Sequence, residues 1–60
     1  MDINEGMKLL ETYDKWLYVR LDNMRKAVEC GEYDAARMIT GDFAALAIKA
    51  NTLANKLADA

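Results

Sequence analysis

Two apolar stripes lie on either side of Gly31 and mirror each other in the sequence. Within each stripe the residues recur alternately every three and four positions, which is the spacing of one face of a helix. The sequence therefore predicts helices over about 2–30 and 33–59, joined by a turn at about 31–32. The first stripe comprises Ile3, Met7, Leu10, Asp14, Leu17, Leu21, Met24 and Val28, and the second comprises Ala36, Ile39, Phe43, Leu46, Ala50, Leu53, Leu57 and Ala60.

The register of the two stripes indicates that the chain folds back on itself. Facing residues of an antiparallel hairpin have numbers whose sum is nearly constant, and both Leu21 with Phe43 and Leu17 with Leu46 satisfy this relation around Gly31. Glycine is also the residue that most readily takes the left-handed conformation that ends a helix. We therefore expect an all-α fold, an antiparallel two-helix hairpin that forms a single domain over residues 1–60.

Two local signals refine the helix boundaries. Asp2 is a candidate N-cap, and Glu5 stands three residues later in the position of a capping box. Thr40, Gly41 and Asp42 could end one helix and start another, but the apolar stripe continues across Gly41 without a change of phase. The second helix is therefore expected to be continuous, with Gly41 on its outermost side.

The segment from Cys30 to Ala36 resembles the turn between the two helices of a tetratricopeptide repeat. The resemblance covers only these residues. Such repeats recur with a period of about 34 residues and have helices of about half the length expected here. It implies shared turn chemistry and no repeat fold.

A chain of 60 residues buries a smaller share of its surface than an ordinary domain does, so a lone hairpin needs further stabilisation. The usual sources are disulfides, a structural metal or self-association. The single cysteine, Cys30, cannot form an internal disulfide, and the sequence has no histidine. The composition therefore predicts that two hairpins associate into a four-helix bundle.

Each helix carries a second strip beside its main stripe. Small residues dominate the strip of the second helix and permit close approach of another helix, whereas the first helix has a cluster of aromatic residues and an arginine, which often dominate binding energies. We assign the small residues to the dimer interface and the cluster to a protein partner; the reverse assignment stays open. The predicted interface is Ala44, Ala47, Ile48, Asn51, Ala54 and Ala58, and the predicted partner site is Leu9, Tyr13, Trp16, Tyr18 and Arg20.

Asp14 stands in the first apolar stripe, where the pattern calls for an apolar side chain. One interpretation makes it a device that selects register or oligomeric state. A second rotates the helix slightly, so that Tyr13 points inward and Asp14 lies at the boundary. A functional acid is a third.

The residue inventory argues against catalysis. The chain has no serine and no histidine, and Cys30 has no evident activating partner. It also lacks a glycine-rich phosphate loop. We predict no enzymatic activity, no cofactor and no metal.

The leading hypothesis is a small cytoplasmic adaptor or inhibitor that acts as a homodimer by binding another protein. The acidic N-terminal run is unlike a secretory signal, and no apolar run is long enough for a membrane span. A formal charge of -2 argues against general nucleic-acid binding. By architectural analogy with dimeric hairpins that regulate plasmid copy number, RNA binding through Lys8, Lys15, Arg20, Arg25 and Lys26 is the alternative, and a structural subunit of a larger helical assembly is another.

Overall fold

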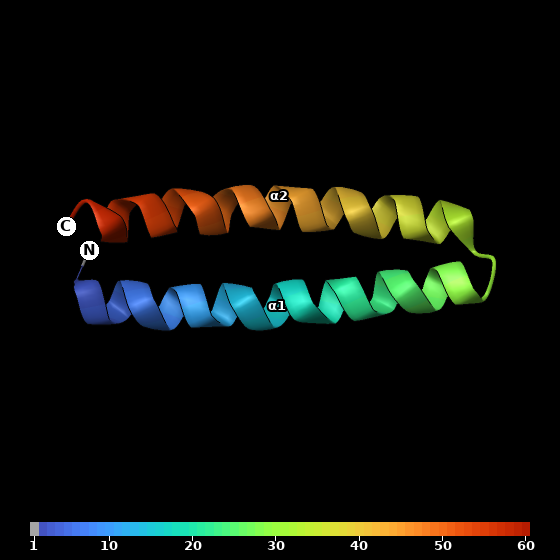
Figure 1. The fold of residues 1–60 in the computed structure, drawn as a ribbon, viewed down its shortest axis with the longest axis horizontal. Helices are drawn as coiled ribbons and strands as arrows, with labels where there is room; N and C mark the ends of the chain where they lie inside the picture. The colour runs from blue at the N-terminus through green and yellow to red at the C-terminus, as the bar shows by residue number, and fades with distance from the viewer. Residues whose placement is uncertain (1) are drawn as a thin grey trace.

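The computed structural model describes residues 2–60 and consists of two antiparallel helices (Figure 1). Helix α1 spans Ile3–Glu29 and helix α2 spans Tyr33–Ala58. The helices lie side by side along their whole length, and the molecule measures 44 × 14 × 12 Å. Residues 2–60 contain no strand. The prediction of an all-α hairpin is confirmed.

The turn between the helices is built around Gly31. Its backbone N–H donates to the carbonyl of Val28 at 3.0 Å, and the N–H of Glu32 donates to the carbonyl of Ala27 at 2.8 Å. These two bonds form a Schellman motif, which needs a left-handed residue at the position of Gly31. Gly31 has a φ of 74° and supplies that conformation. The sequence signal for the turn therefore acts as predicted.

Two glycine substitutions are expected to change stability in opposite directions. Alanine at position 31 must adopt the positive φ of Gly31, so Gly31→Ala should destabilise the fold by about 1 kcal/mol. Gly41 lies within α2, and an added Cβ there would have no neighbour within 4 Å. Gly41→Ala should therefore stabilise the fold by about 0.5 to 1 kcal/mol. Urea unfolding at one fixed protein concentration checks both, and equal signs would contradict this account.

The first helix begins at the predicted place but without the predicted side-chain cap. Asp2 is the N-cap residue, and its carbonyl accepts a hydrogen bond from the Gly6 N–H at 2.9 Å. Within residues 2–60, however, no side-chain hydrogen bond caps α1. The expectation of a capping box formed by Asp2 and Glu5 is therefore wrong, and the acidic charges act only through their proximity to the positive end of the helix dipole.

Helix α2 presents the predicted stripe to α1. Ala36, Leu46 and Leu53 are buried, and the other stripe members up to Leu57 are half-buried. The helix continues through Gly41, which is exposed. The heptad phase therefore identified the contact side of α2 correctly, because one narrow apolar row dominates that side of the helix.

Helix α1 is rotated about its axis relative to the prediction. Gly6 and Ala27 are buried and Tyr13 is half-buried. The expected core residues Ile3, Met7, Leu21 and Val28 instead remain 45–52% exposed. The apolar side of α1 is wider than a single neighbouring helix can cover, and the small residues Gly6 and Ala27 allow the closest approach. This rotation of α1 leaves a row of large apolar side chains available for a further contact.

Candidate protein-binding surfaces

The broad face on which each side chain lies follows from its place beside the contact row. We call the residues of each helix that face the other helix its contact row. In an antiparallel pair, the residue that follows a contact-row residue in the sequence lies on the same broad face of the hairpin in both helices. Met7 and Leu21 follow the contact residues Gly6 and Arg20 on α1, as Ala47 and Ala54 follow Leu46 and Leu53 on α2. These residues therefore share one broad face.

We call this surface the apolar face. Its large residues come from α1 and are about half exposed, whereas its α2 residues are small. An open hollow lies between the two helices there. It is lined by Ala50 of α2 and by Met7, Leu10, Glu11, Asp14 and Leu17 of α1. The apolar face comprises Ile3, Met7, Asp14, Leu21 and Val28 of α1 and Ala44, Ala47, Asn51, Ala54 and Ala58 of α2.

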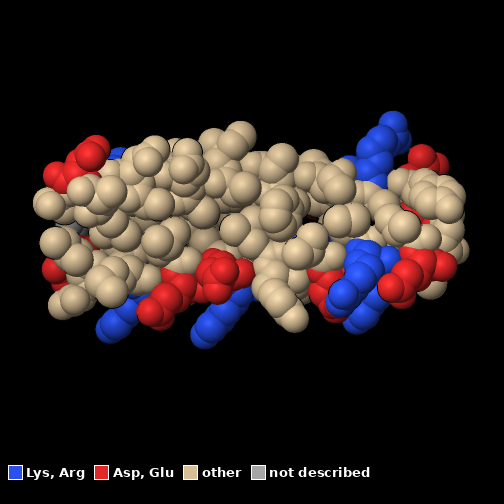
Figure 2. Space-filling model, in the orientation of Figure 1, with Lys and Arg blue, Asp and Glu red and all other residues tan. Residues whose placement is uncertain are grey.

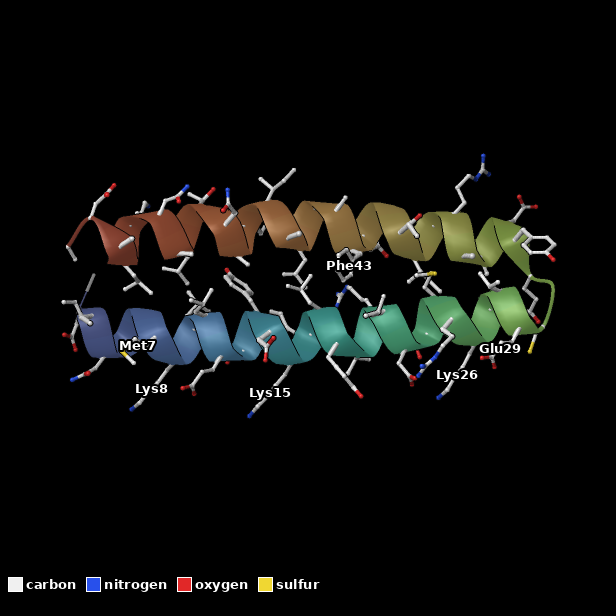
Figure 3. The ribbon with its side chains drawn as sticks, viewed as in Figure 1. Met7, Lys8, Lys15, Lys26, Glu29 and Phe43 are labelled. Atoms are coloured by element: carbon white, nitrogen blue, oxygen red, sulfur yellow. The ribbon has the colours of Figure 1, made fainter. Side chains whose placement is uncertain are left out.

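Charge is distributed unevenly around the apolar face. Figure 2 shows this side of the hairpin, with a broad uncharged surface over α2 and over the boundary between the helices. Charged side chains gather along the outer edge of α1 and at both ends of the hairpin. Lys8, Lys15 and Lys26 point outward from that edge, and Met7 lies inward of them (Figure 3). Large contiguous apolar patches are uncommon on soluble monomers, and Asp14 is the charged residue of this face.

The structure places five of the six residues of the predicted dimer interface on the apolar face. Ala47 and Ala54 are half-buried against α1, and Ala44, Asn51 and Ala58 are exposed. Ile48 lies elsewhere, because it is 68% exposed and lines a hollow with Leu9 and Tyr13 on the opposite face. Sequence reasoning missed the large α1 residues of the apolar face, since their spacing made them candidates for the core.

The opposite broad face carries the aromatic cluster. The rings of Tyr13 and Trp16 meet edge to face, with centroids 5.9 Å apart and an interplanar angle of 61°. Arg20 is half-buried, and its Nη1 donates to the Trp16 carbonyl at 3.2 Å. Trp16 itself remains 48% exposed. Its ring is thus held by neighbours on one side and open to solvent on the other.

A second hollow continues the cluster toward α2. It is lined by Leu9, Tyr13, Ile48, Lys49, Thr52, Leu53 and Lys56. Lys49 and Lys56 stand two helical turns apart on its border, and neither forms an ion pair within residues 2–60. We call this hollow, together with Trp16 and Arg20, the aromatic face. The lysines were not predicted, although their spacing of seven residues in the sequence was a signal.

Tyr18 does not belong to the aromatic face. It is 72% exposed and borders a hollow with Leu21, Met24 and Val28, next to the apolar face. The predicted partner site therefore divides: Leu9, Tyr13, Trp16 and Arg20 lie together, and Tyr18 is separate. A short run of aromatic residues cannot all share one side of a helix, because neighbouring positions differ by about 100°.

Asp14 is exposed and borders the hollow formed with Met7, Leu17 and Ala50. Tyr13 takes the inward position beside it and is half-buried. This arrangement matches the interpretation in which a small rotation of α1 moves Asp14 out of the hairpin core. Within one hairpin the carboxylate is hydrated, and it becomes enclosed only if another molecule covers the apolar face.

Basic residues near the turn end are engaged by an acid on the same helix. Asp22 contacts Arg25 at 2.8 Å and Lys26 at 3.1 Å. The hydrogen bond from Arg25, followed by that from Lys26, lowers the pKa of the Asp22 carboxyl from its ordinary value of 3.8. The stabilisation that the two ion pairs of Asp22 contribute is present above the ordinary pKa of 3.8 and is lost as the pH falls through the lowered pKa.

Comparison with protein families, curated proteins and solved structures found no match for this chain. In the part of the chain that the structure describes, no group of histidine, cysteine and acidic side chains could hold a metal ion. Neither helix of this part combines the length and the apolar character that crossing a membrane requires. Function is therefore inferred from the two faces and their residues.

Proposed function

We propose that this protein is a homodimeric adaptor or inhibitor that binds another protein and catalyses no reaction. The observation that supports this most is the difference between the two broad faces of the hairpin: one exposes large apolar residues, and the other carries the Tyr13–Trp16 pair beside a hollow. The apolar face would hold two copies together as a four-helix bundle, and the aromatic face of each copy would bind the partner. The proposal places the dimer in the cytoplasm, where the exposed Cys30 stays reduced.

The surface area of the hairpin supports self-association. A folded monomer of 6.8 kDa is expected to expose about 4,000 Å², whereas this hairpin exposes 4714 Å². The excess of about 700 Å² approaches the ~800 Å² that each partner buries in a standard interface. The elongated shape contributes to this excess, and Met7 and Leu21 are among the large apolar residues that stay about half exposed. A second copy on the apolar face would remove this surface from water.

We expect the protein to be a dimer at micromolar concentration. Light scattering should give twice the chain mass, and the thermal midpoint should rise with protein concentration, because association stabilises the folded state by mass action. A monomer mass with full helix content would overturn the proposed dimer. A midpoint that does not change with concentration would count equally against it.

The chemistry of the aromatic face favours a helical segment with an apolar anchor and flanking acidic residues. Trp16 and Tyr13 supply the kind of aromatic surface that dominates binding energies. Lys49 and Lys56 border the hollow without internal partners among the described residues. Carboxylates of a partner could pair with them at the rim of the contact.

A selection from a displayed library of helical peptides tests this partner chemistry. The wild-type protein should enrich peptides with apolar residues at helical spacing and with glutamate or aspartate beside them. Lys49→Glu should weaken binding of the enriched peptides about three- to tenfold, through the lost pairing and the new repulsion. Lys15→Glu changes the same charge on the outer edge of α1 (Figure 3) and should leave binding unchanged. Enrichment without acidic residues would refute the proposed chemistry.

RNA binding is the weaker candidate. Of the five basic residues proposed for it, Arg25 and Lys26 pair with Asp22, and Arg20 donates to the Trp16 carbonyl. Lys8 and Lys15 remain on the outer edge of α1 (Figure 3), and along that edge blue and red atoms lie side by side (Figure 2). Nucleic-acid affinity comes mainly from basic groups that neutralise phosphates. Binding of a homopolymeric RNA that Lys15→Glu abolishes would favour this alternative.

A further inference from the structure

We infer that the two hairpins of the dimer pair lengthwise, with α1 of each copy on α2 of the other and both turns at the same end of the bundle. This inference rests on the proposed homodimer. Two hairpins can meet through the apolar face about a two-fold axis that runs either along the helices or across them. The lengthwise axis places α1 on α2 of the second copy. The crosswise axis places α1 on α1 and α2 on α2, with the turns at opposite ends.

The sizes of the exposed side chains favour the lengthwise axis. The α1 half of the apolar face presents Ile3, Met7, Leu21 and Val28, each about half exposed, whereas the α2 half is mostly alanine. Large residues opposite small ones fill an interface at even helix spacing. The crosswise axis would place the large residues of the two α1 helices against each other and the small residues of the two α2 helices against each other. The α1 helices would be forced apart, and a gap would remain between the α2 helices.

The polar residues of the apolar face point to the same axis. Asp14 is level with Ala50 across the hairpin, since both line one hollow, and Asn51 is the next residue of α2. Rotation about a lengthwise axis keeps each residue at the same position along the bundle. Asp14 of one copy therefore comes opposite Asn51 of the second copy. The amide N–H₂ of asparagine can donate to the carboxylate. The interface would thus satisfy both of these polar groups.

The crosswise axis would produce the opposite electrostatic result. Asp14 lies near the middle of α1, which spans Ile3–Glu29. If the two α1 helices pair about their midpoints, the two Asp14 residues are separated by only about 6 Å along the helix axis. Two carboxylates would then be enclosed together, and like charges without partners are costly in an interface. Asn51 would face the other α2, away from Asp14.

Distances between spin labels on Cys30 test the axis directly. Cys30 is exposed and follows the last residue of α1, so the dimer can be labelled without disturbing packed residues. The lengthwise axis predicts a label separation of about 15–30 Å, set by the spacing of packed helices and the label arms. The crosswise axis places the labels near opposite ends of a 44 Å molecule. A dimer with only the long separation overturns the inference, whereas a monomer by light scattering overturns the proposed dimer instead.

A double-mutant cycle supplies a second readout. Asn51→Leu leaves Asp14 without its partner and should weaken the dimer about tenfold or more. Adding Asp14→Leu should restore association, because an apolar pair replaces the hydrogen-bonded one. The opposite result would be that Asn51→Leu has no effect, whereas Asp14→Leu strengthens the dimer equally with Asn51 or with leucine at position 51. The two carboxylates would then face each other, and the lengthwise axis would be wrong.

Discussion

Glutamate in place of Ala54 is expected to dissociate the homodimer and to remove much of its helix content, and Ala47→Glu is expected to do the same. Both alanines are half-buried beside the contact with α1 and belong to the apolar face. A carboxylate there would be enclosed without a partner, which costs at least about 3 kcal/mol and raises the dimer Kd more than a hundredfold. Sedimentation or light scattering, together with circular dichroism, measures both effects.

Two further variants separate the dimer from the hairpin itself. Ala44 is exposed in the hairpin and lies on the apolar face, so Ala44→Glu should weaken the dimer without a direct clash inside one hairpin. Ala45 is also exposed but lies toward the other face, because the adjacent positions 44 and 45 point in directions about 100° apart on the helix. Ala45→Glu should therefore associate normally. Wild-type association of all three apolar-face variants would show that the dimer uses another surface.

Trp16→Ala is expected to weaken partner binding about thirtyfold or more while the dimer persists. Truncation of a tryptophan that anchors an interface typically costs 2 kcal/mol or more, which is roughly a thirtyfold loss of affinity. Because Trp16 is already 48% exposed, its loss should destabilise the fold by less than the about 3 to 5 kcal/mol typical of a fully buried tryptophan. Affinity for peptides selected on the wild-type protein and the thermal midpoint of the variant measure the two effects.

A matched aromatic truncation serves as the control. Tyr33 is 69% exposed and begins α2 beside the turn, away from the Tyr13–Trp16 pair, so Tyr33→Ala should keep both the dimer and the partner. The fluorescence of wild-type Trp16 should be red-shifted and quenched by iodide, and it should shift to the blue when a selected peptide binds. Dissociation or unfolding of Trp16→Ala would assign the tryptophan to the structural core and remove it from the partner site.

The two helices differ in how well their contact sides could be predicted. On α2 the buried residues Ala36, Leu46 and Leu53 belong to the predicted stripe, because small or polar residues flank it on both sides. On α1 the apolar arc is wide enough to offer two overlapping rows. The structure selects the row containing Gly6 and Ala27, since the closest approach of two helices is decided by the side chains of both.

The candidate surfaces were predictable only in part for the same reason. The Tyr13–Trp16 contact and the contact of Arg20 with the Trp16 carbonyl follow from spacings of three and four residues along one helix. Tyr18 was grouped with them by proximity in the chain, although its direction on the helix differs. Lys49 and Lys56 join the site from α2, and a contribution from the other helix depends on which sides of the two helices meet.

The sequence by itself determined the two helices, the turn at Gly31 and the contact stripe of α2, because each depends on local backbone preference and on periodicity within one segment. Only the tertiary structure decided the rotation of α1, and with it the positions of Asp14, Met7 and Leu21 on an exposed face. A helix with a wide apolar arc has several rotations of similar local energy, and the choice among them comes from the shape of the helix against which it packs.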